Sequence, residues 1–433
     1  MKLKQFILSI LLLLFTSATI NAQFSFDSYA LQNVNIIDVN TNNILYDYTI
    51  VITKDKIHDI IPSKKYKAND TIQSFILKGK FVVPGLIDSH VHFATDPTEE
   101  RRDNAEKVLN EMLLTGITSV RDMAGDSRAL SSLSRNALVG DIIAPNIYYS
   151  SLMAGTKFFS DKRTIATAQG GVSGKMPYMK AIDDNSNIEL EVAQAKGTGA
   201  QGIKLYASLT KEQILKILAE AKKQDFPVWS HGSLIPALPS EVIPSGVISI
   251  SHSVMLVDEK YQKKEDIPAN WKGVGAKEMP AEFWDKEYSK LELDKLFKLM
   301  KEYNVVLDAT LSVYEQYKNS DNAHWRFEMA KRINRDANKM GVKVAAGSDT
   351  DQATFVQHEM KLLISESNFT PFQAIIAATK YSAQATGILK TEGTIEVGKK
   401  ANFLFLNSNP IENINNIDDI FLVIKNGKLY NKK

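Results

Sequence analysis

The two ends of the chain share a short alternation of apolar and polar residues. It runs through ALQNVNIIDV, NILYDYTIVITKDKIHDIIP and TIQSFILKGKF within residues 26–80, and again through GTIEVGKKANFLFLNSNP and DIFLVIKNGKLY near the C-terminus. A period of two residues predicts strands with one buried face, and the Asn, Asp and Lys clusters between them predict turns. We therefore expect one β-rich domain made from residues 23–83 and 392–433.

The long insertion between these ends, residues 84–391, alternates strand-like runs with amphipathic helical stretches. LTKEQILKILAEAKKQ and LDKLFKLMKEYN are examples of the helical stretches. The apolar or β-branched runs number eight and lie at 82–92, 117–122, 146–151, 202–207, 227–231, 247–252, 304–310 and 342–349. Eight strands with helical crossovers predict a closed parallel (β/α)8 barrel of the α/β class.

A charged segment with two tryptophans, residues 258–292, follows the sixth strand-like run directly. Long loops after barrel strands often carry function, so it can cover the mouth of the barrel and contact substrate. The alternative is a solvated loop, and the sequence leaves both open.

The first 22 residues have the pattern of a secretory signal peptide. Lys2 and Lys4 precede the apolar run FILSILLLLF, and small residues follow it up to Ala22. Ten residues are too few to span a bilayer, which needs about 20. We expect cleavage near Ala22, export to the periplasm or the medium, and no stable membrane anchor afterwards.

Charge and cysteine content narrow the chemistry further. Removal of residues 1–22 leaves 50 basic and 50 acidic residues, because only Lys2 and Lys4 are lost from 52 basic ones. This balance gives no electrostatic case for a nucleic acid partner. The chain has no cysteine, so disulfides and thiolate metal ligands are excluded, which leaves imidazole, carboxylate and a modified lysine as ligands.

Metal-binding residue types stand at the ends of five strand-like segments: FVVPGLIDSHVH, GIKLY, FPVWSH, VISISH and GVKVAAGSD. The candidate ligands in these segments are His90, His92, Lys204, His231, His252 and Asp349. His90 and His92 are two residues apart on one strand, so both can point to one ion. Active sites of such barrels lie at the carboxyl ends of the strands, where all six residues are placed.

On these residues the chain resembles the metal-dependent amidohydrolase superfamily, in its imidazolonepropionase-like and prolidase-like branch. The resemblance rests on FVVPGLIDSHVHF, GITSVRDMAG, GIKLYAS, the two later histidines, AAGSDT and GTIEVGKKANFLFLNSNPIENI. It implies a distorted (β/α)8 TIM barrel with a small β-sandwich domain formed by both termini. Two sites depart from the pattern of many relatives, at Ser251-His252-Ser253 and at His231-Gly232-Ser233-Leu234.

The resemblance also implies a role for each candidate ligand. His90, His92 and Asp349 would bind one divalent ion, and His231 and His252 a second. Lys204 would be carbamylated and bridge both ions, which we expect to be Zn²⁺. The ions would share a hydroxide and polarise the substrate carbonyl. Asp349 would be the catalytic general base and then acid.

The expected function is therefore a secreted two-metal hydrolase of an amide or cyclic amide C–N bond in a small peptide-like substrate. Tyr206 and His358 are candidate substrate contacts, although Tyr206 can equally be packing material and His358 a helix-surface residue. His58 and His324 are expected on the surface, and Arg121 and Asp122 in a structural ion pair. The alternatives are a one-metal deaminase, which would usually lack the bridging lysine, and a catalytically silent binding protein on the same fold. The sequence leaves the oligomeric state open.

Overall fold

The structure is a computed structural model that describes residues 23–24, 26–68, 72–95, 98–273, 275–349 and 355–431. The expected signal peptide, residues 1–22, lies outside these residues. Within them, no helix combines the length and the apolar character that crossing a membrane requires.

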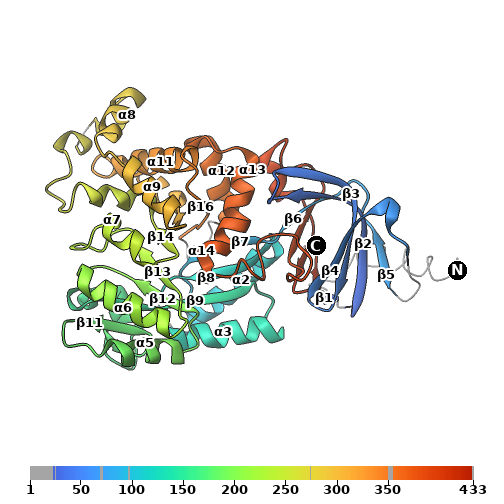
Figure 1. Cartoon of the computed structure of the whole chain (residues 1–433), viewed down its shortest axis with the longest axis horizontal. Helices are drawn as coiled ribbons and strands as arrows, with labels where there is room; N and C mark the ends of the chain where they lie inside the picture. The colour runs from blue at the N-terminus through green and yellow to red at the C-terminus, as the bar shows by residue number, and fades with distance from the viewer. Residues whose placement is uncertain are drawn as a thin grey trace.

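Eight parallel strands form the barrel predicted from the sequence, and Figure 1 shows it at one end of the long axis of the molecule. The strands are β7 (Leu86–Val91), β8 (Ile117–Asp122), β9 (Asn146–Gly155), β12 (Gly202–Leu205), β13 (Val228–His231), β14 (Ser249–Ser251), β15 (Val306–Asp308) and β16 (Val344–Ala345). They pair in this order, from β7 with β8 to β15 with β16. The seam between the last strand and the first is bridged when Ser89 N donates to Ala346 O at 3.2 Å.

The predicted eighth strand is much shorter than the apolar run 342–349. Only Val344–Ala345 pair as a strand, and the chain then bends past His90, where Asp349 N donates to His90 O at 2.8 Å. An antiparallel hairpin, β10 (Lys175–Met176) and β11 (Met179–Ile182), was not predicted and extends the barrel sheet at β9.

Helices surround the barrel between its strands. Their ends follow local sequence signals; for example, Thr210 and Gln213 make a capping box at the start of α6. The helices are α2 (Glu99–Leu114), α3 (Ser127–Val139), α4 (Lys162–Thr167), α5 (Ile188–Gly197), α6 (Lys211–Lys223), α7 (Pro239–Val242), α8 (Ala281–Ser289), α9 (Asp294–Glu302), α10 (Leu311–Glu315), α11 (His324–Lys339), α12 (Val356–Ser367), α13 (Pro371–Ile376) and α14 (Ser382–Thr386).

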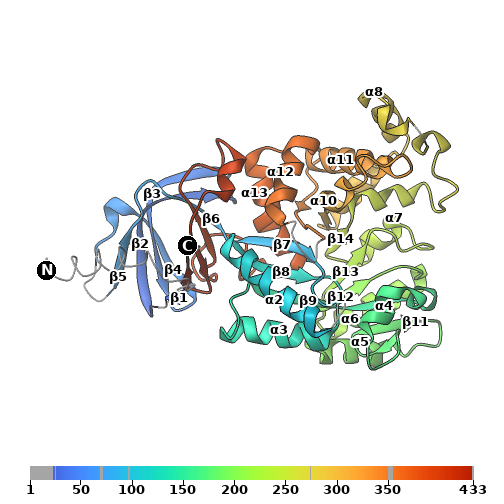
Figure 2. The same ribbon diagram turned by 180° about the vertical axis from the view of Figure 1, so that it is seen from behind.

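A second, nine-stranded sheet joins the two ends of the chain and lies at the other end of the molecule, as seen from both sides in Figures 1 and 2. Its core includes Tyr29, Ile50, Phe403 and Ile424, so residues nearly 400 positions apart pack together. Its strands are β1 (Gln23–Phe24), β2 (Ser28–Asp38), β3 (Asn43–Thr53), β4 (Lys56–Pro62), β5 (Gln73–Ile76), β6 (Phe81–Pro84), β17 (Phe403–Leu406), β18 (Ile420–Lys425) and β19 (Lys428–Tyr430).

The predicted strand 82–92 is in fact two strands in two different sheets. β6 pairs with β17 in the small sheet, and β7 pairs with β8 in the barrel. Gly85 joins them where the backbone comes so close to Thr118 that a Cβ at position 85 would overlap its side chain. This junction places the start of the barrel directly beside the small sheet.

Residues 258–292 fold into a compact aromatic unit, so a fully solvated loop does not describe them. Trp271 and Trp284 are buried, and Trp271 Nε1 donates to Glu287 at 2.9 Å. Trp271 also packs against Trp325 on α11, with 5.7 Å between ring centroids. The unit includes α8, which lies at the end of the molecule opposite the small sheet in Figure 1.

Candidate metal centre

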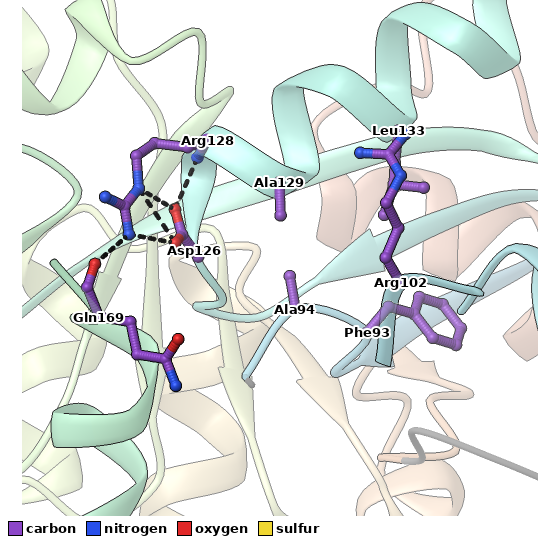
Figure 3. Close-up of a pocket in the computed structure, with 8 residues that line it drawn as sticks. All are labelled: Phe93, Ala94, Arg102, Asp126, Arg128, Ala129, Leu133 and Gln169. Atoms are coloured by element: carbon purple, nitrogen blue, oxygen red, sulfur yellow. Dashed lines mark hydrogen bonds and ion pairs between the residues drawn. The ribbon is translucent and has the colours of Figure 1, made fainter. Parts of the chain in front are cut away.

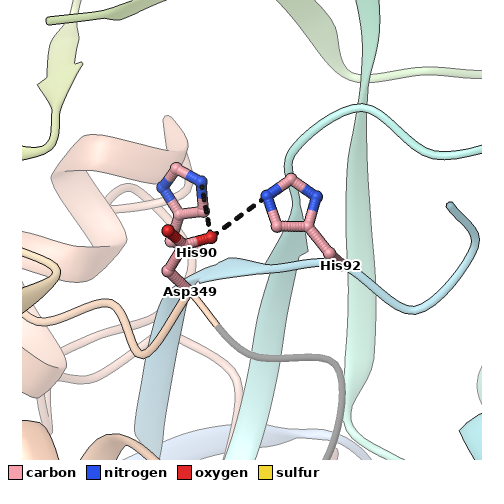
Figure 4. Close-up of side chains that lie close together, drawn as sticks. All are labelled: His90, His92 and Asp349. Carbon is pink, nitrogen blue, oxygen red and sulfur yellow. Dashed lines mark ion pairs between the residues drawn. The ribbon is translucent and has the colours of Figure 1, made fainter. Parts of the chain in front are cut away.

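His90, His92 and Asp349 lie together at the carboxyl ends of β7 and β16. Asp349 Oδ1 is 3.2 Å from His92 Nε2 and 3.6 Å from His90 Nε2, so one oxygen faces both rings (Figure 4). One donor atom from each of the three residues falls within 4.8 Å of the others. His90 is 1% exposed and His92 31%, which places the cluster between the barrel interior and its mouth. These three side chains can hold one ion between them.

Two further histidines stand beside this cluster. The ring of His252 is 4.7 Å from that of His90 and 4.7 Å from that of His231, centroid to centroid. His252 Nδ1 lies 2.8 Å from Thr310 Oγ1 and 3.6 Å from Asp349 Oδ2. His231 Nδ1 lies 3.0 Å from both the carbonyl oxygen and the amide nitrogen of Ser233, and when Nδ1–H donates to the carbonyl, Nε2 of that ring keeps its lone pair for another partner. The structure thus brings four of the seven histidines to one place.

Lys204 is the sixth predicted residue of this group, on the fully buried strand β12. Its Nζ donates to Ser251 Oγ at 3.2 Å, and it forms no ion pair with any residue in the described part of the chain. Burial lowers the pKa of Lys204 to about 7, and the nearby Arg121 lowers it as well. These effects outweigh the negative charges of Asp308 and Asp349, which raise the pKa, and the neutral amine is the form that can react with CO2.

The electrostatics favour ligand-competent protonation states at His90, His231 and Asp349, whereas at His92 burial lowers the pKa but the hydrogen bond and charge of Asp349 raise it above its ordinary value. Burial lowers the pKa of His90 to about 4 and that of His231 to about 3, and the charge of Lys204 adds to both shifts. Burial alone would raise the pKa of Asp349, but the neighbouring His90 and His92 bring it below its ordinary value. Neutral imidazoles and an ionised carboxylate are the forms that bind divalent metals.

Tyr206 and His358, the two candidate substrate contacts, lie in different surroundings. The Tyr206 ring packs against His231 at 4.2 Å and against Phe158 at 4.6 Å, so it belongs to the wall of the histidine cluster. His358 lies on α12, 45% exposed, with its Nε2 2.6 Å from Glu315. That position fits the helix-surface alternative.

Sequence reasoning missed Asp308, the last residue of β15. Asp308 Oδ2 lies 2.9 Å from His90 Nδ1, and its side chain is fully buried. It also pairs with Arg121 at 3.1 Å, so the expected ion pair between Arg121 and Asp122 is wrong. Asp122 instead accepts from the backbone N–H groups of Phe93 and Gly125. Asp308 could have been identified from the sequence, because it stands at the end of a predicted barrel strand.

Two other histidines complete the set. His58 is exposed, as expected. The expectation for His324 is wrong, because it is buried at the start of α11 with its Nδ1 2.6 Å from Lys318 O. The aromatic unit of residues 258–292 covers His324, whose ring lies 5.7 Å from that of Trp284.

A cavity of about 380 Å³, shown in Figure 3, is lined by none of the residues of the cluster. It begins at Phe93, the residue after His92, and extends between α2 and α3. Arg128 holds Asp126 at 2.6 Å, which neutralises the carboxylate in the lining. The lining contains no histidine: Phe93, Ala94, Arg102, Asp126, Arg128, Ala129, Leu133 and Gln169. It lacks the groups that metal-dependent chemistry needs.

The donor atoms of the cluster fit a divalent metal centre. They are imidazole nitrogens and a carboxylate oxygen from strand ends, and their spacing allows shared coordination of one ion. The two further histidines lie close enough to extend the centre, the charge of Lys204 acts on His90 and His231, and Asp308 contacts Nδ1 of His90.

Known proteins resemble this chain over most of its length. Ochratoxinase from Aspergillus niger is 24% identical over 401 residues, which cover 81% of this chain and 75% of that protein. Imidazolonepropionase from Yersinia pseudotuberculosis (serotype O:1b) is 20% identical over 82% of this chain and 85% of its own length. A Xaa-Pro dipeptidase crystallised with methionine in the active site shares the fold, with a TM-score of 0.73, 22% identity, and coverage of 94% and 100%.

The sequence model of the Amidohydrolase family matches residues 81–430. The match contains the whole barrel, every residue of the candidate metal centre and the C-terminal strands of the small sheet. The predicted fold, a TIM barrel beside a small domain formed by both termini, is confirmed. The chain therefore belongs to the amidohydrolase family, as a hydrolase that acts on carbon–nitrogen bonds.

Proposed function

We propose that this protein is an exported hydrolase with two divalent ions, which cleaves an amide or cyclic amide bond in a small peptide-like substrate. The observation that carries the proposal is the convergence of four histidines, Asp349 and Lys204 at the carboxyl ends of the barrel strands, where His90, His231, His252 and Lys204 are buried. Export rests on the sequence of residues 1–22.

Each residue of the cluster has a proposed place in the centre. His90, His92 and Asp349 would hold one ion, and His231 and His252 would hold the second. Lys204 would bridge both as a carbamate, which forms when its neutral amine nitrogen bonds to the carbon of CO2 and the proton released passes to solvent. The absence of an ion pair at Lys204 supports this assignment, because an ammonium in so buried a place is costly. We expect Zn²⁺, since imidazole and carboxylate ligands suit it.

Bound divalent ions would supply Lewis-acid polarisation of the substrate carbonyl and acidify water at the site. Asp349 accepts the proton of the water that attacks the carbonyl carbon. It then donates this proton to the leaving nitrogen as the C–N bond breaks, so the products are a carboxylic acid and an amine. Its position between His90 and His92 keeps it ionised and therefore ready to accept the proton.

The substrate class follows from the relatives and from the walls of the site. Ochratoxinase, Xaa-Pro dipeptidase and imidazolonepropionase are the similar proteins, and we extend a peptide-like or cyclic amide substrate to this chain by analogy with their names. Tyr206 is the proposed substrate contact from this chain, because its ring packs on His231. His358 is the weaker candidate, since Glu315 already binds it.

A panel of dipeptides, N-acyl amino acids and lactams tests the proposed reaction. We expect hydrolysis of at least one amide class, with loss of activity after chelation and recovery on adding Zn²⁺. A parallel assay with adenosine-type and guanine-type amines tests the one-metal deaminase alternative, which a release of ammonia without amide cleavage would favour. No turnover in either panel by metal-loaded protein would favour the catalytically silent alternative.

A further inference from the structure

Asp308 occupies a central position behind the candidate metal centre. It is fully buried, and its two oxygens receive four side-chain hydrogen bonds. Its Oδ2 accepts from Arg121 Nη2 at 3.1 Å and from Ser251 Oγ at 3.1 Å, and it faces His90 Nδ1 at 2.9 Å. Its Oδ1 accepts from Ser89 Oγ at 2.8 Å. The contacts with Arg121 and His90 hold this carboxylate in place.

Two of these contacts lead to different halves of the candidate centre. The first reaches His90, which faces Asp349 with its other nitrogen. The second reaches Lys204 through Ser251, whose hydroxyl donates to Asp308 and accepts from Lys204 Nζ at 3.2 Å. The strand register produces this arrangement, because Ser251 is paired with Asp308 across β14 and β15. One oxygen atom therefore touches His90 directly and Lys204 through one hydroxyl.

We propose that Asp308 is a positioning residue that couples the two halves of the metal centre, with Ser251 as the link to Lys204. This inference rests on the two-metal function proposed above. When His90 donates its Nδ1 proton to Asp308, its Nε2 keeps a lone pair directed at the ion. Ser251 in turn fixes the position of Lys204 Nζ by accepting its hydrogen bond. A substitution at Asp308 should therefore change the binding of both ions.

Arg121 makes the arrangement stable in a buried place. Its guanidinium pairs with Asp308, and it also donates to Ser89 O at 2.7 Å and to Ala385 O at 2.6 Å. These contacts fix the arginine to β7 and to α14. Because the arginine is fixed, the Asp308 carboxylate cannot turn without losing its ion pair with Arg121. The negative charge of Asp308 thus stays directed at His90 and Ser251.

The test compares three variants in the full-length protein: Asp308→Asn, Ser251→Ala and the matched control Ser249→Ala. Ser249 is also a buried serine on β14, but its hydroxyl contacts Arg121 at 3.1 Å and not Asp308 or Lys204. Affinity for Zn²⁺ is measured for each binding step by competition with a chelating dye. Thermal unfolding of the metal-free proteins reports stability separately.

We expect Asp308→Asn to weaken both binding steps by about 10- to 100-fold, the usual range for a residue that orients a metal ligand. Ser251→Ala should weaken only the step that Lys204→Ala abolishes, by about 10-fold. Ser249→Ala should leave both steps within about twofold of the wild type. A cobalt-loaded Asp308→Asn protein should also show a changed visible spectrum, which a loss of stability alone would not produce.

The coupling is wrong if Ser251→Ala and Ser249→Ala behave alike, or if Asp308→Asn changes one step alone. It is also wrong if Asp308→Asn loses metal-free stability while both affinities stay native. A wild-type protein that binds a single ion would contradict the two-metal function instead. In that case Asp308→Asn still tests the contact to His90, and an unchanged affinity for that ion overturns the positioning role as well.

Discussion

Asp349 combines two tasks that a single substitution can separate. Asn has nearly the shape of Asp and can still offer one oxygen to a metal, but it cannot accept and return a proton. Asp349→Asn should therefore keep much of its metal while kcat falls by about 10²- to 10⁴-fold, the range for loss of a general acid–base group. KM should change less, because the loss falls on the transition state.

Steady-state kinetics with metal analysis of the same preparation check this prediction, and Asp349→Ala, which offers no oxygen, is the control that should lose metal. Near-native turnover of Asp349→Asn at full metal occupancy would show that another group carries the proton.

Lys204 gives the second residue-scale prediction. Lys204→Ala should lose one of the two ions and most activity, because the proposed bridge disappears. Short carboxylic acids should restore part of the activity, since a carboxylate that enters the space left by the side chain imitates the carbamate. Metal analysis and activity assays with and without acetate or propionate measure both effects. An unmodified Lys204 ammonium in a metal-loaded crystal structure would exclude the bridging role.

At the scale of residues, the sequence identified the candidate ligands that lie together but not the residue that holds them in position, Asp308. The four histidines, Lys204 and Asp349 stand out because each ends an apolar strand. Asp308 also ends such a strand, yet aspartate is common, and only the register of β14 and β15 shows that it reaches His90 and Ser251. Pairing partners across strands are not written in a local pattern, which is why Arg121 was given the wrong partner.

At the scale of elements, α12 stabilises the chain that follows β15. Glu359 on α12 is fully buried and accepts hydrogen bonds from Leu311 N at 2.7 Å and from Ser312 N at 2.6 Å. These bonds hold the start of α10 just after Thr310, whose hydroxyl contacts His252. Burial raises the pKa of Glu359 from 4.5 to about 8, although the two backbone donors lower it in part.

A raised pKa makes the contribution of Glu359 to stability depend on pH. In the folded protein the side chain keeps its proton up to about pH 8, whereas in the unfolded chain it loses it near pH 4.5. Its stabilisation is therefore complete below about pH 4.5 and is lost progressively as the pH rises to about 8, at up to about 1.4 kcal/mol per pH unit. Glu359→Gln removes this dependence and adds a constant cost for one lost acceptor.

Denaturant unfolding of metal-free wild type and Glu359→Gln at pH 5, 7 and 9 measures the effect. The wild type should lose stability relative to the variant between pH 5 and 7, and more slowly above pH 8. A difference between the two proteins that stays constant across this range would show that Glu359 is ionised when folded.

Element boundaries were the least predictable feature from the sequence. The run 82–92 reads as one strand because its apolar character is continuous, but Gly85 lets the chain leave the small sheet and enter the barrel. The run 342–349 also reads as one strand, yet only two residues pair, since the chain must turn to bring Asp349 beside His90. In both places tertiary contacts, not local pattern, decide where a strand ends.

At the scale of the whole molecule, the order of elements was predictable and carries the function. The alternation of strands and helices predicted eight barrel strands, and the matching β-rich ends predicted one domain made from both termini. A parallel barrel brings the carboxyl ends of all its strands to one mouth. Residues from His90 to Asp349, nearly 260 positions apart, therefore reach one site. The folded aromatic unit of residues 258–292 could not be foreseen, because its contacts with α11 join distant segments.

The number of metal ions per chain tests the central claim most directly. Elemental analysis of full-length protein, purified without chelator and then loaded with excess Zn²⁺ and bicarbonate before desalting, gives this number. Our account predicts about two ions per chain, and about one in Lys204→Ala, because His90, His92 and Asp349 remain. One ion or none in the fully loaded wild type would contradict it.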